Sequence, residues 1–137
     1  MNVAIRYYSR GGNTQRLAEA IAQAINVPAK PVTEPLEAAV DVLFLCNSVY
    51  WAGADGKVKS FVKDNASKIG KLVNVSTAAM IESTYKQIKS LAEKCGISVC
   101  EREFHCKGSF VGLHKGKPDD ADCQAAAEFA KGVVSGE

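Results

Sequence analysis

Stretches of consecutive hydrophobic residues alternate along the chain with stretches in which hydrophobic residues recur every three or four positions. The first pattern is typical of strands buried on both faces, and the second of helices with one buried face. One short stretch is crowded by three prolines and is predicted to form an edge strand, because proline cannot donate to the ladder of a central strand. The predicted strands are residues 2–8, 29–33, 40–46, 72–77 and 97–104.

The helical pattern occurs in four segments, and three of them have recognisable start or stop signals. The Val27–Pro28 junction ends the first helix, and Gly96 ends the third. Asp119 is suited to cap the last helix, where Asp120 and Asp122 also complement the helix dipole. The predicted helices are residues 13–26, 57–68, 83–95 and from 120 to near the end of the chain, with a short helical turn near 34–39.

Strands that alternate with helices predict an α/β fold. Right-handed crossovers join such units into a doubly wound parallel sheet of five strands with helices on both faces. The 137 residues, of which 47% are hydrophobic, fit a single domain over residues 1–137. Ligands of such folds bind beyond the carboxyl ends of the strands. Three segments after strands are therefore expected to converge on one site: Ser9–Thr14, Asn47–Gly56 and Ser76–Ala79.

The first of these segments has the composition of a phosphate-binding turn between a strand and a helix. The start of a helix presents backbone N–H groups without intrahelical partners at the positive end of the helix dipole. Glycines let the backbone approach a ligand closely, and hydroxyl and amide side chains add donors. The alternative is a glycine-rich turn that only caps its own helix. The residues concerned are Ser9, Arg10, Gly11, Gly12, Asn13 and Thr14.

Charge and hydropathy exclude several classes of partner. The formal net charge is only +2, and no cluster of Lys and Arg with interleaved aromatic residues occurs, so nucleic acid is not an expected partner. No apolar run reaches the roughly 18 residues of a membrane span. The first residues also lack the pattern of a signal peptide. We therefore expect a cytoplasmic protein without a membrane-inserted segment.

The cysteine pattern predicts free thiols. Five cysteines are present, an odd number, and no two have C-x-x-C spacing. Cys46 and Cys123 lie at apolar-face positions and are predicted to be core residues. His105 and His114 lie near Cys106, but a metal site needs more ligands at suitable spacing. Neither a metal site nor a catalytic residue is predicted.

The order of elements and the turns between them resemble those of flavodoxins, and the resemblance covers nearly the whole chain. Flavodoxins have a sheet in the order 2-1-3-4-5 and bind FMN beside the first and third strands. Their phosphate turn has the pattern T/S-x-T/S-G-x-T, which Ser9–Thr14 matches except at Gly11, where a hydroxyl is lost. The resemblance therefore implies this strand order, FMN as the cofactor and a phosphate site at Ser9–Thr14.

The resemblance also implies the remaining cofactor-binding residues. In flavodoxins an aromatic residue after the third strand stacks on the flavin, and backbone groups after the fourth strand contact its pyrimidine edge. A flexible peptide near the stacking residue turns toward flavin N5 when the flavin takes up one electron. An aromatic that merely covers the end of the third strand is the alternative. The matching residues are Ser48, Val49, Tyr50 and Trp51 for stacking, Ser76, Thr77, Ala78 and Ala79 for the pyrimidine edge, and Ala52 and Gly53, or alternatively Asp55 and Gly56, for the flexible peptide.

Two departures from flavodoxins bear on function. Flavodoxins tend to be strongly acidic, which steers them toward basic partners, whereas this chain is nearly neutral. The segment after the fourth strand also lacks an aromatic to cover the second flavin face, and Met80 is only a partial substitute. We expect an FMN-binding electron-transfer protein that acts with a reductase and an acceptor protein. The alternatives are a small FMN-dependent NAD(P)H reductase of quinones or flavins, and a flavin-free binding module.

Overall fold

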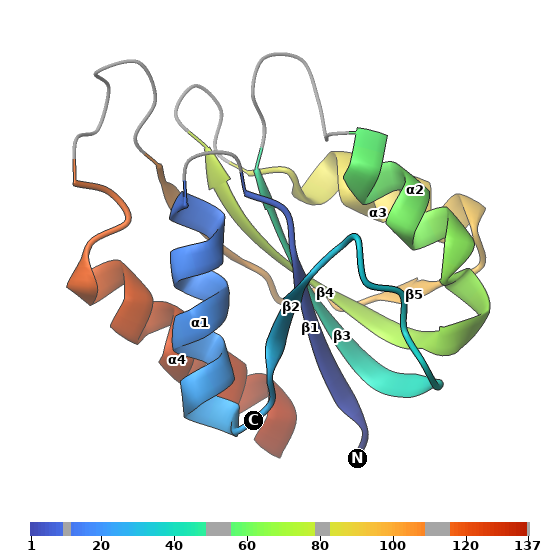
Figure 1. The fold of residues 1–137 in the computed structure, drawn as a ribbon, viewed down its shortest axis with the longest axis horizontal. Helices are drawn as coiled ribbons and strands as arrows, with labels where there is room; N and C mark the ends of the chain where they lie inside the picture. Colours follow the sequence, from blue (N-terminus) through green and yellow to red (C-terminus); the bar gives the residue numbers. More distant parts are fainter. Residues whose placement is uncertain (10–11, 49–55, 79–82, 109–115, 137) are drawn as a thin grey trace.

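A parallel sheet with helices on both faces forms the centre of the molecule, as Figure 1 shows for the computed structural model. The structure describes residues 1–9, 12–48, 56–78, 83–108 and 116–136. The sheet has the order β2-β1-β3-β4-β5, and β6 also pairs with β4. The predicted architecture and strand order are therefore confirmed. The strands are β1 (Val3–Tyr7), β2 (Ala29–Pro31), β3 (Val40–Ser48), β4 (Ile69–Ala78), β5 (Ser98–Val99) and β6 (Phe104–Lys107).

The helices cover the two faces of the sheet in pairs. On one face lie α1 (Asn13–Ile25) and α4 (Asp120–Ser135), and on the other α2 (Gly56–Asp64) and α3 (Tyr85–Lys94) (Figure 1). Each pair buries its own hydrophobic cluster because alternate residues of the strands point to opposite faces. In β3, for example, Leu43 and Leu45 face α2 and α3, whereas Phe44 faces α1 and α4. No helix in the described ranges is long and apolar enough to cross a membrane.

The predicted fifth strand, residues 97–104, is wrong as one continuous element. It is divided into β5, which pairs with the start of β4, and β6, which pairs with the end of β4. The charged residues between the two pieces explain the interruption. The guanidinium group of Arg102 lies 5.5 Å from the ring centre of Phe129, and Glu103 accepts a hydrogen bond from Ser83. These side chains have partners outside the ladder.

The predicted helical turn near 34–39 is also wrong, because its backbone is bonded to side chains from elsewhere. The Arg6 guanidinium donates to the carbonyl oxygens of Glu34 at 2.9 Å and Pro35 at 3.2 Å. Asn65 Oδ1 accepts the N–H of Leu36 at 2.9 Å. As a result, no helix lies between β2 and β3 to cover the edge of the sheet there.

The predicted helix 57–68 is shorter than expected. It ends at Asp64, before the separate 3₁₀ turn η1 (Ala66–Lys68).

Two smaller predictions can be compared with the structure directly. Asp119 caps α4 in a reciprocal capping box with Asp122, as predicted. These bonds, together with the ammonium group of Lys117, lower the pKa of Asp119 to about 2. Cys46 is completely buried, as predicted, whereas Cys123 is only half-buried against the same cluster. All five cysteines are free thiols.

Candidate functional site

The carboxyl ends of β1, β3, β4 and β6 lie along one edge of the sheet. This follows from the parallel pairing, in which Tyr7 is opposite Cys46 and Ser48 is opposite Thr77. At its end, β6 places Lys107 opposite Ala78. The helices α1, α2 and α3 begin at this same edge (Figure 1). Segments that are distant in sequence therefore meet here, as the alternating pattern predicts.

The turn between β1 and α1 is held by a bond from its own serine. Ser9 Oγ accepts the N–H of Gly12 at 2.9 Å. Gly12 is the N-cap of α1 with a left-handed backbone (φ +91°), a conformation that glycine adopts without strain. Glycine offers no side chain to cap the helix, and the first turn contains no acidic residue. The positive end of the α1 dipole is thus free of any carboxylate from its own first turn, which suits an anion.

Beneath this turn, a pair of hydroxyl groups joins α1 to β4. Thr14 Oγ1 and Thr77 Oγ1 are 3.1 Å apart, and both residues are buried. Gly108 packs on the same spot, because a Cβ added to it would lie 3.1 Å from Thr77 Cβ and 3.3 Å from Asn13 Nδ2. The N–H of Gly108 also donates to the carbonyl oxygen of Ala78 at 3.3 Å. The start of α1, the end of β4 and the residue after β6 are therefore in direct contact.

Ser48 contributes a buried hydroxyl to this region. The residue is 4% exposed, and its Oγ makes no hydrogen bond with any residue that the structure describes. Alternation along β3 places Ser48 on the same face as Phe44 and Cys46, the face covered by α1. Its neighbour across the ladder is Thr77. An unpaired buried hydroxyl costs about 1–3 kcal/mol, so its position at this edge fits a group that accepts a ligand.

On the opposite face, three buried side chains form a closed ring of hydrogen bonds. Asn47 Nδ2 donates to Asn74 Oδ1 at 2.8 Å, and Asn74 Nδ2 donates to Thr84 Oγ1 at 2.9 Å. Thr84 Oγ1 completes the ring by donating to Asn47 Oδ1 at 2.6 Å. All three residues are completely buried. The ring fixes the end of β3, the middle of β4 and the residue before α3 relative to one another.

A second set of bonds continues from the ring to the start of α3. Ser76 Oγ accepts the N–H of Thr84 at 3.4 Å, and Ser83 Oγ accepts the N–H of Tyr85 at 2.9 Å. Ser83 in turn donates to Glu103 Oε1 at 2.5 Å. The positions on either side of residues 79–82 are therefore rigidly connected.

Comparison with known proteins identifies the fold. No protein-family model matches the sequence, and no curated protein is detectably similar to it. A flavodoxin from the domain Archaea matches with a TM-score of 0.79 at 16% identity, over 99% of this chain and 98% of its own. The chain has the flavodoxin fold. Flavodoxin 1 from Bacillus cereus matches over 98% of each chain (TM-score 0.74, 16% identity). Rubredoxin oxygen:oxidoreductase from Desulfovibrio gigas matches with TM-score 0.74 and 12% identity, over 98% of this chain and 35% of its own.

The flavodoxin fold brings together those predicted site residues that the structure describes. Ser76, Thr77 and Ala78 belong to β4 and Ser48 to β3, so both strands extend beyond their predicted ends at residues 77 and 46. The Thr14 hydroxyl is engaged with Thr77, whereas the sequence suggests it as a phosphate donor. The described residues are Ser9, Gly12, Asn13, Thr14, Ser48, Ser76, Thr77 and Ala78, and those outside the described ranges are Arg10, Gly11, Val49, Tyr50, Trp51, Ala52, Gly53 and Ala79.

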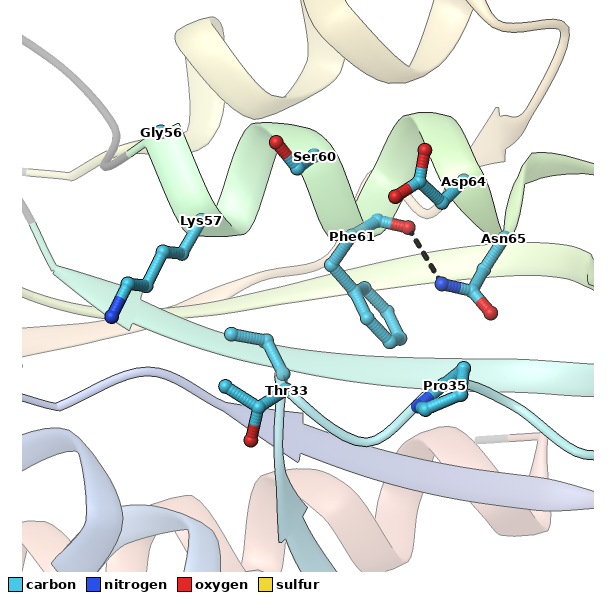
Figure 2. A pocket seen from close by; sticks show the side chains of 9 residues that line it. Thr33, Pro35, Gly56, Lys57, Ser60, Phe61, Asp64 and Asn65 are labelled. Atoms are coloured by element: carbon cyan, nitrogen blue, oxygen red, sulfur yellow. Dashed lines mark hydrogen bonds between the residues drawn. The ribbon is translucent and has the colours of Figure 1, made fainter.

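Two hollows elsewhere on the flavodoxin fold contain none of these residues. A cavity of about 480 Å³ lies between residues 32–35 and α2, where the helix after β2 is missing. Figure 2 shows the Phe61 ring pointing toward Pro35 in this cavity, with Lys57 and Asp64 at opposite ends of α2. Another hollow, of about 330 Å³, lies beside His105, Cys106 and Lys117.

The Cys106 thiol of β6 is not activated as a nucleophile. Burial, aided by the carboxylate of Asp122, raises the pKa of Cys106 to about 12, so this thiol stays protonated at neutral pH. Within the described ranges, no three His, Cys, Asp or Glu side chains are grouped as a metal site would need. Among the described residues of the carboxyl edge, the Oγ of Ser48 and the backbone N–H groups at the start of α1 are suited to bind a ligand.

We expect the substitution Gly108→Ala to lower the free energy of unfolding by about 1–3 kcal/mol. The added methyl group would press on Thr77 and Asn13 at 3.1–3.3 Å. Gly56→Ala is the matched control, because no described atom beyond its chain neighbours and its own helix backbone lies within 4 Å of the added Cβ, and alanine favours the helix that begins there. Urea denaturation of both variants measures the difference. A loss of the same size at both glycines would contradict close packing at Gly108.

Proposed function

We propose that the chain binds FMN at the carboxyl edge of its sheet and carries electrons between redox proteins. The observation that carries this proposal is the buried Oγ of Ser48, which has no hydrogen-bond partner among the described residues and lies across the ladder from Thr77 of the Thr14–Thr77 pair. A buried hydroxyl without a partner carries a cost in free energy, which a ligand that forms a hydrogen bond with it would remove. The similarity in fold to solved flavodoxins supports the same conclusion.

The described residues fit the parts of FMN that carry charge and hydroxyl groups. The backbone N–H groups at the start of α1, behind Gly12, suit the phosphate dianion. The Oγ of Ser48 suits a hydroxyl of the ribityl chain, since it can donate and accept. The backbone of Ala78 suits the edge of the flavin ring, because its side chain is small. Bound FMN supplies one- and two-electron transfer, while these residues orient it and exclude water.

The aromatic residues Tyr50 and Trp51 are proposed to stack on the flavin ring on the strength of the sequence. Stacking adds roughly 0.5–1.5 kcal/mol to each ring contact beyond burial. We propose that the loaded protein acts as an electron carrier in the cytoplasm. Activity of the FMN-loaded protein alone toward NADH or NADPH would instead favour the reductase. Failure to take up FMN would favour the flavin-free binding module.

The decisive experiment compares FMN binding and stability in the wild type and in Ser48→Ala. We expect the flavin-free variant to be more stable than the wild type by about 1 kcal/mol, because the unpaired hydroxyl is gone. The same variant should bind FMN about 10-fold more weakly, because the hydroxyl loses its ligand partner. Flavin fluorescence quenching measures the affinity, and urea denaturation measures the stability.

Ser90→Ala is the control for this experiment. Ser90 is exposed on α3, so its replacement should alter neither FMN affinity nor stability by a measurable amount. FMN affinity that is unchanged in Ser48→Ala would remove Ser48 from the cofactor site. A gain in stability with a loss of affinity, seen only at Ser48, is the signature of a hydroxyl reserved for a ligand.

A further inference from the structure

The two helical layers of the molecule carry opposite charge. On one face, α2 and α3 contain six lysines and two carboxylates, a net charge of +4. On the other face, α1 and α4 contain one arginine, one lysine and four carboxylates, a net charge of −2. The small net charge of the whole chain therefore conceals a strong separation of charge between the faces of the sheet. The lysines are Lys57, Lys59 and Lys63 in α2, and Lys86, Lys89 and Lys94 in α3.

We name the outer surface of α2 and α3, which carries these six lysines, the basic face. The helices α2 and α3 contact each other on the same side of the sheet (Figure 1). Lys57 lies on the side of α2 that faces residues 32–35 (Figure 2), so helical periodicity puts Lys59 and Lys63 toward α3. Along α3, Lys86, Lys89 and Lys94 border a shallow hollow of about 520 Å³. The basic face is thus formed by side chains that point outward from two adjacent helices.

Most of this charge is available to a partner. Five of the six lysines are exposed, and Lys89 is partly exposed, with its ammonium group 5.8 Å from the ring centre of Tyr85. Among the described residues, Lys59, Lys63 and Lys86 take part in no ion pair. Like charges held close together raise the potential of a surface, which attracts a partner of opposite charge.

We propose that the basic face is the docking surface for an acidic redox protein that exchanges electrons with the cofactor. This inference rests on the proposed FMN site and names the partner of that site. Lys57 and Lys86 lie in the first turns of α2 and α3, which begin at the carboxyl edge of the sheet. A protein seated on the basic face therefore adjoins the edge at which FMN is proposed to bind.

Two other anionic partners fit the basic face less well. Anchoring in a membrane surface needs exposed apolar side chains beside the charges. Met1 is the one large hydrophobic residue exposed in the described ranges, and it belongs to neither helix. Nucleic-acid sites favour arginine and stacked aromatic residues, whereas α2 and α3 present lysine alone as the basic residue. Lysine is a hydrated point charge, which suits a transient complex between two proteins.

The test measures electron transfer from a reduced, acidic [2Fe–2S] ferredoxin to the FMN-loaded protein by stopped flow. In this step the cluster loses one electron and the bound FMN gains it. We expect Lys59→Glu combined with Lys86→Glu to lower the second-order rate constant about 10-fold at low ionic strength. The difference should shrink to about 2-fold or less at 0.5 M salt, where exposed charges are screened. Both substitutions put a carboxylate into a first helical turn, which favours the helix.

The matched control combines Lys71→Glu with Lys131→Glu, which changes the net charge equally but away from the basic face. Both lysines are exposed, one near the start of β4 and one on α4. The proposal requires the control to keep its rate constant within about 2-fold of the wild type. An equal loss in both double variants would overturn it, because net charge rather than the basic face would then steer the ferredoxin.

Two binding assays cover the alternative partners. Phosphatidylglycerol vesicles and a single-stranded 20-nucleotide DNA are each mixed with wild type and with Lys59→Glu/Lys86→Glu. The proposal would be overturned if the wild type bound the vesicles or the DNA, the double variant did not, and electron transfer from the ferredoxin showed no salt-sensitive difference between the two proteins. A membrane or a nucleic acid would then be the favoured partner. Flavin absorbance is measured first, so a protein that fails to load FMN refutes the proposed cofactor. A protein that loads FMN but shows no effect of the charge reversals refutes only the docking surface.

Discussion

Replacing Thr84 by valine is expected to lower the free energy of unfolding by about 2–4 kcal/mol. Valine has the shape of threonine, so the change removes the hydroxyl and leaves no cavity. Thr84 Oγ1 is donor to Asn47 and acceptor from Asn74, and both partners are completely buried. The substitution thus leaves two amide atoms without partners, each at a cost of about 1–3 kcal/mol. Urea denaturation followed by circular dichroism measures the loss.

The same substitution at an exposed threonine separates the ring from general effects of valine. Thr33 is exposed at the border of the cavity beside α2, so Thr33→Val should change stability by less than about 0.5 kcal/mol. Thr84→Ser keeps the hydroxyl and loses only a methyl group, which should restore most of the stability. If Thr84→Ser and Thr84→Val are equally destabilising, packing of the methyl group and not the hydrogen-bonded ring holds this corner together.

The hydrophobic pattern predicts the sheet well because the position of a strand in the sheet depends on its burial, and burial can be inferred from the hydrophobicity of the strand's own residues. The nearly continuous apolar run at 40–46 does form the central strand β3, and the proline-rich stretch forms the edge strand β2. Both strands differ in length from the prediction. The polar residues Asn47 and Ser48 continue β3 because their neighbours in β4 complete the ladder. Composition alone suggests a turn there.

The parts that the sequence does not predict are those that depend on partners far along the chain. Asn47, Asn74 and Thr84 are ordinary polar residues by composition, and only the pairing of β3 with β4 brings them together. The interrupted fifth strand has the same cause, since the partners of Arg102 and Glu103 lie in α4 and before α3. Residues 34–39 fail as a helix because the side chain of Arg6 binds their carbonyl groups. A local pattern contains none of these partners.

The separation of charge between the two layers is a further feature that total composition conceals. A net charge of +2 suggests a protein without electrostatic steering. Once the helices are assigned to faces, the same residues give a basic α2–α3 layer and an acidic α1–α4 layer. This chain differs from the strongly acidic flavodoxins in having a basic α2–α3 layer, and a basic surface favours acidic partners.

Riboflavin, which lacks the phosphate, is expected to bind at least about 100-fold more weakly than FMN. The phosphate is proposed to lie at the start of α1, where Gly12 leaves the helix end open and the first turn holds no carboxylate. Charge-assisted bonds from backbone N–H groups, together with the helix dipole, account for about 3 kcal/mol. Titration of each flavin by fluorescence quenching measures the ratio.

The variant Ser9→Ala tests whether the turn itself, and not a general attraction of the protein for flavins, produces this ratio. Ser9 Oγ accepts the N–H of Gly12 and so holds the backbone of the turn in place. Its loss should weaken FMN binding about 5- to 10-fold, about 1 kcal/mol, and leave riboflavin binding unchanged. If Ser9→Ala weakened the binding of FMN and riboflavin equally, the turn would act on the flavin ring and not on the phosphate. If the wild type bound FMN and riboflavin with equal affinity, the phosphate would not lie at the start of α1.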